Sequence, residues 1–219
     1  MDGTGRLWRA MASRDRRFEG VFVVGVKTTG IYCRPGCPAR LPKRVNVTFF
    51  GCAAAAEHAG FRACMRCRPD RSPTAPMPNG TPTTVTRALR LIAEGALDRE
   101  PLEAFAERLG VGGRHLRRLF DEHLGVSPAA VAQTHRTHFA RQLVESTDLA
   151  MTEIAHAAGF ASVRRFNGAV RTAFGLSPTG IRSRASSPSR GIVLRLPFRP
   201  PYDWDAMLGF LAPRAIPGV

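Results

Sequence analysis

The stretches C-R-P-G-C at residues 33–37 and C-M-R-C at residues 64–67 decide how the first part of this chain folds. They are separated by 26 residues, from Pro38 to Ala63. Two close cysteine pairs suit a tetrahedral zinc site, because each pair supplies two sulfurs from one tight turn. We therefore expect one zinc ion per chain, with four ligands: Cys33, Cys37, Cys64 and Cys67.

Disulfides and a redox-active pair are the alternatives to a metal site. Residues 1–18 contain five arginines and no apolar core segment, so we expect no secretory signal and a cytoplasmic protein, in which structural disulfides are rare. A redox pair at residues 64–67 would need a surrounding βαβ pattern, which is missing, and would leave the first pair unexplained. The fifth cysteine, Cys52, lies beside an alanine run and is predicted to be a small buried hydrophobic residue.

The charge of the chain indicates its partner. Residues 1–75 contain 14 basic and 5 acidic side chains, a net +9, and residues 76–185 contain 14 and 10, a net +4. A basic surface on a cytoplasmic protein points to nucleic acid, although a generally arginine-rich proteome would also produce one. No apolar run approaches the roughly 20 residues of a membrane span, so we expect no membrane association.

Two stretches rich in Pro, Gly and Ser, at residues 72–83 and 185–190, are predicted linkers. They leave a first domain at 1–71, a second at 84–184 and a fragment at 191–219. The first domain is predicted to be α+β, because two apolar β-branched runs precede a short alanine-rich helix. Its expected strands are 21–26 and 45–49, and its expected helix is 53–58. This domain is small for an unaided core, so a metal is expected to complete it.

The motifs around the cysteines resemble the N-terminal domain of the bacterial alkylation-response protein Ada. The resemblance covers about residues 5–71 and is carried by V-K-T-T-G-I-Y-C-R-P-G-C-P-A-R (26–40), R-V-N-V (44–47) and A-G-F-R-A-C-M-R-C-R-P (59–69). It implies a domain in which four cysteines bind one zinc and the first of them, here Cys33, accepts a methyl group from a methylphosphotriester in the DNA backbone. It also implies DNA contacts from three residues: Thr29, Arg40 and Arg62.

The chemistry of such a transfer is consistent with the residues present. A thiolate is a good nucleophile, and zinc removes the thiol proton outright. Direct displacement needs no general base, which agrees with the lack of a Ser/His/Asp or paired-carboxylate pattern in residues 1–71. The transfer removes one negative charge that faces the DNA, so DNA affinity is expected to rise. The sequence offers no demethylation step, so one turnover per molecule is expected.

The second domain is predicted to be all-α and duplicated. A helix at 102–111 and a second over 113–121 form a helix-turn-helix pattern, and after a long helix at 128–146 the plan repeats with a recognition helix at 162–172. The second copy, with I-A-H-A-A-G-F (154–160) and F-G-L-S-P (174–178), resembles the AraC family. In that family two such units read adjacent major-groove segments. The expected DNA contacts are exposed arginines of the two recognition helices: Arg114, Arg117, Arg118, Arg164 and Arg165. An ordinary helical bundle with an arginine-rich face is the alternative.

The last fragment is similar to the opening of the N-terminal domain of AlkA-type DNA glycosylases. A strand at 192–196 and a helix at 205–211 are expected, giving an incomplete β/α fragment, and a disordered apolar tail is the alternative. The resemblance includes neither the catalytic part of a glycosylase nor the second Ada methyltransferase motif. We therefore expect neither base excision nor direct guanine repair.

The sequence predicts a DNA-alkylation sensor and transcriptional regulator: a single-turnover methyltransferase that becomes an activator, with double-stranded DNA and RNA polymerase as partners. Two alternatives remain. One is a transcription factor with a purely structural zinc, and the other is the regulatory half of a split Ada–AlkA glycosylase.

Overall fold

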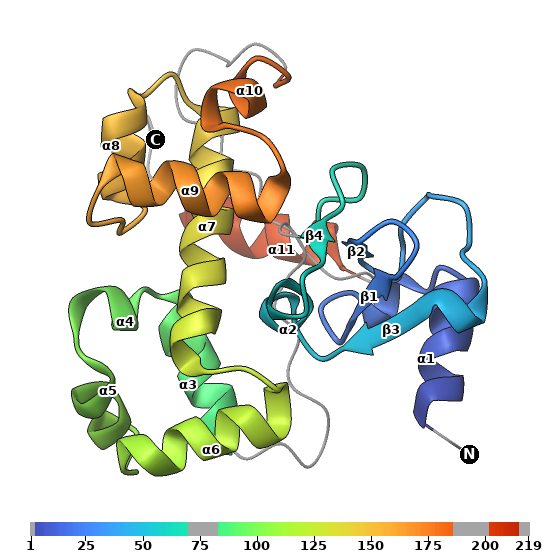
Figure 1. The fold of residues 1–219 in the computed structure, drawn as a ribbon, viewed down its shortest axis with the longest axis horizontal. Helices are drawn as coiled ribbons and strands as arrows, with labels where there is room; N and C mark the ends of the chain where they lie inside the picture. The colour runs from blue at the N-terminus through green and yellow to red at the C-terminus, as the bar shows by residue number, and fades with distance from the viewer. Residues whose placement is uncertain (1–2, 70–82, 186–201, 215–219) are drawn as a thin grey trace.

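The computed structural model describes residues 3–69, 83–185 and 202–214 (Figure 1). The first part of the chain is a small α+β domain, and the second is entirely helical, as the sequence predicts. Both predicted linkers and the strand expected at 192–196 lie largely or wholly outside the described residues. No helix in the described part of the chain is both long and apolar enough to cross a membrane.

A four-stranded sheet with the order β3-β1-β2-β4 organises the first domain. Strand β1 pairs antiparallel with both β2 and β3, and β2 pairs in parallel with β4. Two of these strands, β2 and β4, were not predicted, because two or three residues give no periodicity to detect. The expected strand at 45–49 is shifted, since a 3-10 turn occupies its start. The elements in this part of the chain are α1 (Gly3–Ala12), η1 (Arg16–Phe18), β1 (Val23–Val26), β2 (Ile31–Cys33), η2 (Arg44–Asn46), β3 (Val47–Phe50), α2 (Ala53–His58) and β4 (Arg62–Ala63).

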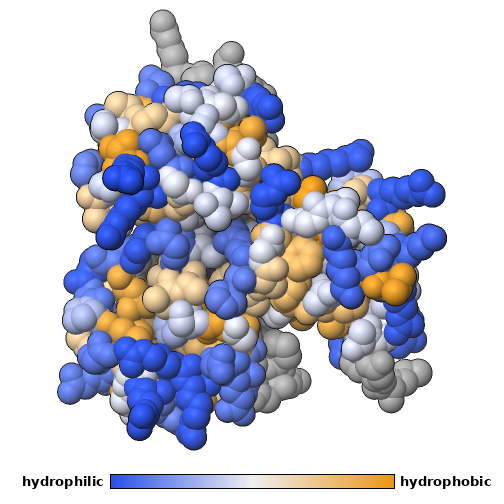
Figure 2. Space-filling model, viewed as in Figure 1, coloured by the Kyte–Doolittle hydropathy of each residue, from blue (hydrophilic) through white to orange (hydrophobic). Residues whose placement is uncertain are grey.

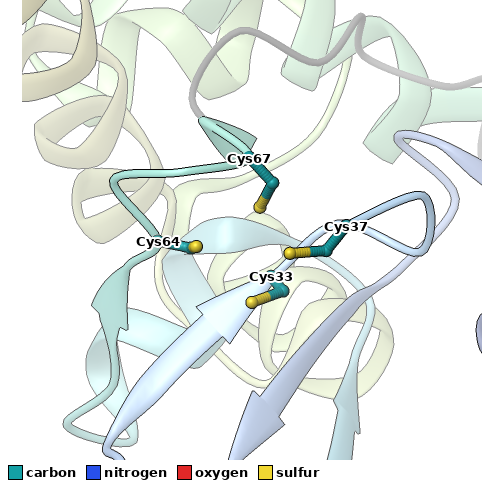
Figure 3. A group of neighbouring side chains, drawn as sticks. All are labelled: Cys33, Cys37, Cys64 and Cys67. Atoms are coloured by element: carbon teal, nitrogen blue, oxygen red, sulfur yellow. The ribbon is translucent and has the colours of Figure 1, made fainter. Parts of the chain in front are cut away.

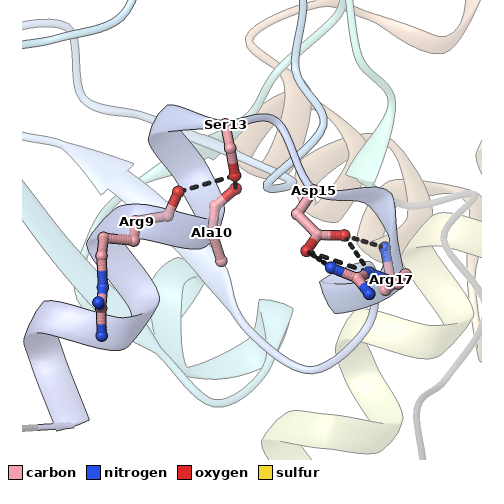
Figure 4. A network of polar contacts seen from close by, with 5 residues as sticks. All are labelled: Arg9, Ala10, Ser13, Asp15 and Arg17. Carbon is pink, nitrogen blue, oxygen red and sulfur yellow. Dashed lines mark hydrogen bonds and ion pairs between the residues drawn. The ribbon is translucent and has the colours of Figure 1, made fainter.

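Strand β1 is apolar throughout because both faces of the sheet are covered. Val24 is buried with Phe22 in a cluster that includes residues of α1, whereas the adjacent Val23 belongs to a larger core shared with the helical domain. Neighbouring side chains of a strand point to opposite faces, so the valines of β1 contribute to two different hydrophobic clusters. Helix α1, which was not predicted, ends in a polar turn in which the Ser13 hydroxyl donates to the Arg9 carbonyl at 2.9 Å and Asp15 pairs with Arg17 at 2.7 Å (Figure 4).

The helical domain consists of two helix-turn-helix units joined by the long helix α7 (Figure 1). The units are α5–α6 and α8–α9, and their buried residues form two separate clusters. Helix α6 begins at Gly113 without a side-chain cap, and α9 continues through the exposed Gly168. The remaining elements are α3 (Thr83–Ala93), α4 (Ala96–Arg99), α5 (Leu102–Arg108), α6 (Gly113–Leu124), α7 (Pro128–Ser146), α8 (Met151–Ala157), α9 (Val163–Phe174), α10 (Pro178–Arg182), α11 (Trp204–Leu211) and η4 (Ala212–Arg214).

Helix α2 joins the two domains. Its alanines are divided between the two helical cores: Ala56 packs with the α8–α9 core, and Ala54 and Ala55 pack with the α5–α6 core. Alanine side chains let helices approach closely, and α2 makes extensive contact with α7. Figure 1 shows α2 beside the middle of α7, between the two helix-turn-helix units.

A buried polar cluster sits in this junction around Glu57 of α2. Its carboxylate accepts hydrogen bonds from the Tyr32 hydroxyl at 2.8 Å and from the Thr134 hydroxyl at 2.7 Å, and it lies 2.8 Å from His138 Nε2. Burial by itself would raise the pKa of Glu57, but the His138 charge and these hydrogen bonds together hold it below its usual value. The sequence offers no signal for this cluster, because His138 is 81 residues away from Glu57.

We expect Glu57→Gln to lower the free energy of unfolding by about 1–3 kcal/mol at neutral pH, the cost of weakening a buried charged hydrogen-bond cluster. Because the folded-state pKa of Glu57 is depressed, its contribution is complete above the ordinary value of 4.5 and is lost as the pH falls through the folded pKa. Urea unfolding of both proteins between neutral pH and about pH 3 measures this difference. Glu94→Gln, in the exposed turn that follows α3, is the control, and a difference that persisted unchanged into acid would contradict the assignment.

Candidate metal centre and nucleic-acid interface

The parallel pairing of β2 with β4 brings the two cysteine pairs together. Ile31 lies opposite Arg62 and Tyr32 opposite Ala63, so Cys33 and Cys64 leave the sheet side by side. The Cys64 amide confirms this alignment by donating to the Tyr32 carbonyl at 3.0 Å. Cys33 is the last residue of β2, and the other three cysteines lie in the turns that follow β2 and β4 (Figure 3).

The four sulfurs converge on one point, as Figure 3 shows, and all lie within 4.8 Å of one another. Ligands about 2.3 Å from a tetrahedral zinc ion are about 3.8 Å apart, so the cluster needs little adjustment to hold one. The expected set of four ligands is therefore together in the structure. Cys52 is not part of it: this half-buried residue is the N-cap of α2 and packs against the α5–α6 core.

The four thiols strongly perturb one another. A hydrogen bond with Cys37 is the main cause that raises the pKa of Cys33, and a hydrogen bond with Cys33 is the main cause that lowers the pKa of Cys64. The pKa of Cys37 falls to about 7, again mainly through Cys33. Four neighbouring sulfurs cannot all ionise unless a cation offsets their repulsion. The donor set thus fits a soft divalent ion such as zinc.

The loop of the first cysteine pair is held by a buried carboxylate. Glu19 is 4% exposed and accepts from Arg34 Nη1 at 2.9 Å and from Arg16 Nε at 3.4 Å. Gly36 lies directly against it, because a Cβ at this position would come within 2.5 Å of Glu19 Oε1. The Cys37 amide donates to the Arg34 carbonyl at 3.1 Å and closes the turn. Glu19 could not be predicted from the sequence, since a single carboxylate 14 residues before Cys33 forms no recognisable motif.

The two cysteine pairs differ in their access to solvent. Cys64 and Cys67 are buried, whereas Cys33 and Cys37 are partly exposed. The first pair is therefore the more accessible of the two. Cys33, the predicted methyl acceptor, belongs to the more exposed pair, and its reactivity stays a prediction.

The predicted DNA contacts of the first domain do not share one environment. Thr29 and Arg40 are exposed, and Arg14 Nη2 donates to the Ala39 carbonyl at 3.2 Å, which fixes the loop beside Arg40. Arg62 is exposed at the boundary with the helical domain, where its guanidinium lies against Gly175 at the end of α9. Contact of these residues with DNA stays a prediction.

The arginines expected to contact DNA from the two recognition helices are all exposed. In α6, Arg117 pairs with Glu103 at 2.8 Å. In α9, the Ser162 hydroxyl accepts a hydrogen bond from the Arg165 amide at 3.3 Å, and this N-cap stabilises the start of the helix. Hydrophilic side chains gather over the α5–α6 end of the face shown in Figure 2. The exposed set is Arg114, Arg117, Arg118, Arg164 and Arg165.

Comparisons with known proteins find matches for each part of the chain. Residues 6–70 match the metal-binding domain of Ada, residues 105–184 match a helix-turn-helix domain, and residues 193–219 match the AlkA N-terminal domain. A bifunctional transcriptional activator/DNA repair enzyme AlkA of Mycobacterium tuberculosis is 47% identical over 99% of this chain and 45% of the relative. The activator/repair enzyme AdaA of Bacillus subtilis is 29% identical over 82% of each chain. A methylated N-Ada/DNA complex shares 38% identity over 62% of this chain and 98% of that chain, with a TM-score of 0.32.

The fold and the site define a class: a four-cysteine zinc domain followed by a double helix-turn-helix domain. The chain is similar to Ada-type activator/DNA repair proteins: it matches the Ada metal-binding domain, a helix-turn-helix domain and the AlkA N-terminal domain in that order. It spans less than half the length of the mycobacterial relative.

We expect Cys64→Ser to reduce the metal content from about one zinc per chain to near zero and to unfold the first domain, because three thiolates and a hydroxyl bind zinc poorly. Cys52→Ser is the matched control. It keeps the zinc and is neutral or stabilising by up to about 1 kcal/mol, because serine is a better N-cap than cysteine. Elemental analysis and thermal unfolding measure both effects. Zinc loss in Cys52→Ser would contradict the ligand assignment.

Proposed function

We propose that this protein is a DNA alkylation sensor that accepts a methyl group at Cys33 and then regulates transcription through its two helix-turn-helix units. The observation that carries the proposal is a partly exposed cysteine within a four-sulfur zinc site, in a chain that also presents two arginine-lined recognition helices. The relatives named as combined activators and repair enzymes support it.

The proposed reaction is a direct displacement. The Cys33 sulfur attacks the methyl carbon of a backbone methylphosphotriester, an S–C bond forms, the C–O bond breaks, and the phosphodiester leaves as an anion. A zinc ion held by the four cysteines keeps their sulfurs deprotonated at neutral pH. Glu19 and Arg34 hold the loop that follows Cys33, so the attacking sulfur is positioned before DNA arrives. The thioether is stable, so each molecule reacts once.

The reaction also changes the charge of the site. Four thiolates and one zinc ion carry a net charge of about −2, and conversion of one thiolate to a thioether leaves about −1. Repulsion between this site and nearby phosphates then falls. The proposed consequence is tighter promoter binding and activation, with RNA polymerase as a further proposed partner.

Zinc-loaded protein incubated with methylated duplex DNA should gain one methyl group per chain and no more, and peptide mapping should place it on Cys33. Intact-protein mass spectrometry measures the gain. Cys33→Ser should accept none, whereas Cys52→Ser should react as the wild type does. If zinc is retained and no methyl is gained, the site is purely structural and the chain is a transcription factor alone.

Methylation should raise DNA affinity on the order of fivefold at low ionic strength, because removing one charge near several phosphates is worth about 1 kcal/mol in water. This local charge effect should diminish as salt screens it. Fluorescence anisotropy with one duplex, over a salt series, measures both proteins. An affinity of the unmethylated protein equal to that of the methylated protein at every salt concentration would rule out the charge switch.

A further inference from the structure

Each cysteine pair is connected to helix α7 by a residue that directly adjoins it. Tyr32, which directly precedes Cys33, is completely buried, and its hydroxyl donates to Glu57 at 2.8 Å and lies 3.4 Å from His138 Nε2 of α7. Arg68, which directly follows Cys67, forms an ion pair with Glu145 of α7. A shift of either cysteine segment would therefore reach α7 through a single neighbouring residue.

The contacts on α7 form one stripe, which we call the docking face. Its members follow the spacing of neighbouring helical turns, so they share one side of the helix. Arg141 is completely buried; its Nη2 lies 3.3 Å from Met65 Sδ, and its Nε donates to Glu145 at 3.2 Å. The docking face is made up of Thr134, His138, Arg141 and Glu145.

The backbone of Arg68 is strained in a way that points to a role for its side chain. Its φ is +54°, the left-handed region that glycine occupies without cost. In an L-residue this conformation persists only where other contacts compensate for it. The guanidinium that bonds Glu145 supplies such a contact at the end of the second cysteine pair.

The docking face continues to the second recognition helix. Phe174, the last residue of α9, lies 4.5 Å from the Arg141 guanidinium and 5.7 Å from the His138 ring, measured to its ring centre. Next to it, Gly175 lies against the guanidinium of Arg62 of β4, and a Cβ at this position would overlap Arg62 Nη1. The end of α9 is thus held between α7 and the zinc domain.

Docking leaves the recognition surfaces open. The five arginines expected to contact DNA from α6 and α9 are exposed while the zinc domain is docked. The docked domain therefore does not act by covering them. The zinc domain contacts both α7 and α9, so it can determine the position of α9 relative to α7.

From these contacts we infer that the docking face couples the state of the cysteine site, both its zinc occupancy and its methylation, to the placement of α9. The methylation part rests on the proposed function; the zinc part does not. The coupling adds to the local charge effect and differs from it in kind. Contacts buried from solvent are screened little by salt, so the coupling should persist where the charge effect has faded.

The variants that test this coupling remove side chains that contact the docking face and leave the cysteines unchanged. We call them the docking-face variants. One is Glu57→Gln combined with Arg68→Gly, and the second is Arg68→Gly alone, in which glycine relieves the strained backbone and the fold is kept. Arg17→Gln is the matched control, because it removes an exposed ion pair of the zinc domain that lies away from α7.

The first measurement is hydrogen–deuterium exchange of α7 and α9 in zinc-loaded and zinc-stripped full-length protein. Zinc removal should speed exchange at the end of α9 at least about fivefold in the wild type and in Arg17→Gln, and by less in both docking-face variants. The inference is overturned if the wild-type change is confined to residues 3–69, or if the variants respond as the wild type does.

The second measurement uses the duplex that the zinc-loaded wild type selects from a random library. At a salt concentration that removes the charge effect, methylated wild type should keep a gain in affinity of at least about fivefold, and the docking-face variants should lose it while still accepting a methyl at Cys33. An equal gain in variants and wild type, or no gain in the wild type, overturns the methylation part. If the wild type accepts no methyl, the proposed function fails, and the exchange experiment still decides the zinc part.

Discussion

Repulsion among four converging sulfurs is the constraint on which the zinc domain depends. The sulfurs lie within 4.8 Å of one another, a distance at which their negative charges need a cation between them. The short parallel pairing of β2 with β4 brings the two cysteine pairs into register. Two or three residues per strand cannot maintain such a pairing by themselves, so metal and sheet stabilise each other. The buried Glu19 adds a third support by fixing the turn that follows Cys33.

The zinc domain packs into the core of the helical domain and is not a separately packed unit. Val23, Ala56 and Ala63 share one buried cluster with residues of α7 and α9. The alanines of α2 explain how this is possible, since larger side chains would hold α2 away from α7. The same helix contributes Glu57, which lies between the strand of Cys33 and the side chains of α7. Apolar packing thus brings the domains together, and the polar cluster fixes their alignment.

The cysteine cluster and the two helix-turn-helix units could be predicted because each depends on local spacing. Cys33 and Cys64 follow motifs that are complete within a few residues, and the apolar residues of α6 and α9 repeat with the helical period. The docking face could not be predicted for the opposite reason. Glu57 and His138 are ordinary residues in their own helices, and only the tertiary fold gives them a shared role. Arg68 could be recognised only from its backbone angle, which no sequence pattern shows.

A sensor that acts through charge alone has a short reach, because mobile ions screen a surface charge within about 10 Å at moderate salt. A charge change at the cysteine site can alter DNA binding close to that site. Its electrostatic effect on α9, transmitted through solvent, would be small. Buried contacts have no such limit. Tyr32 and Arg68 connect the two cysteine segments to α7, and Phe174 connects α7 to the end of α9. In the proposed sensor, methylation of Cys33 therefore acts both on DNA phosphates close to the site and, through the protein interior, on α9, the proposed recognition helix.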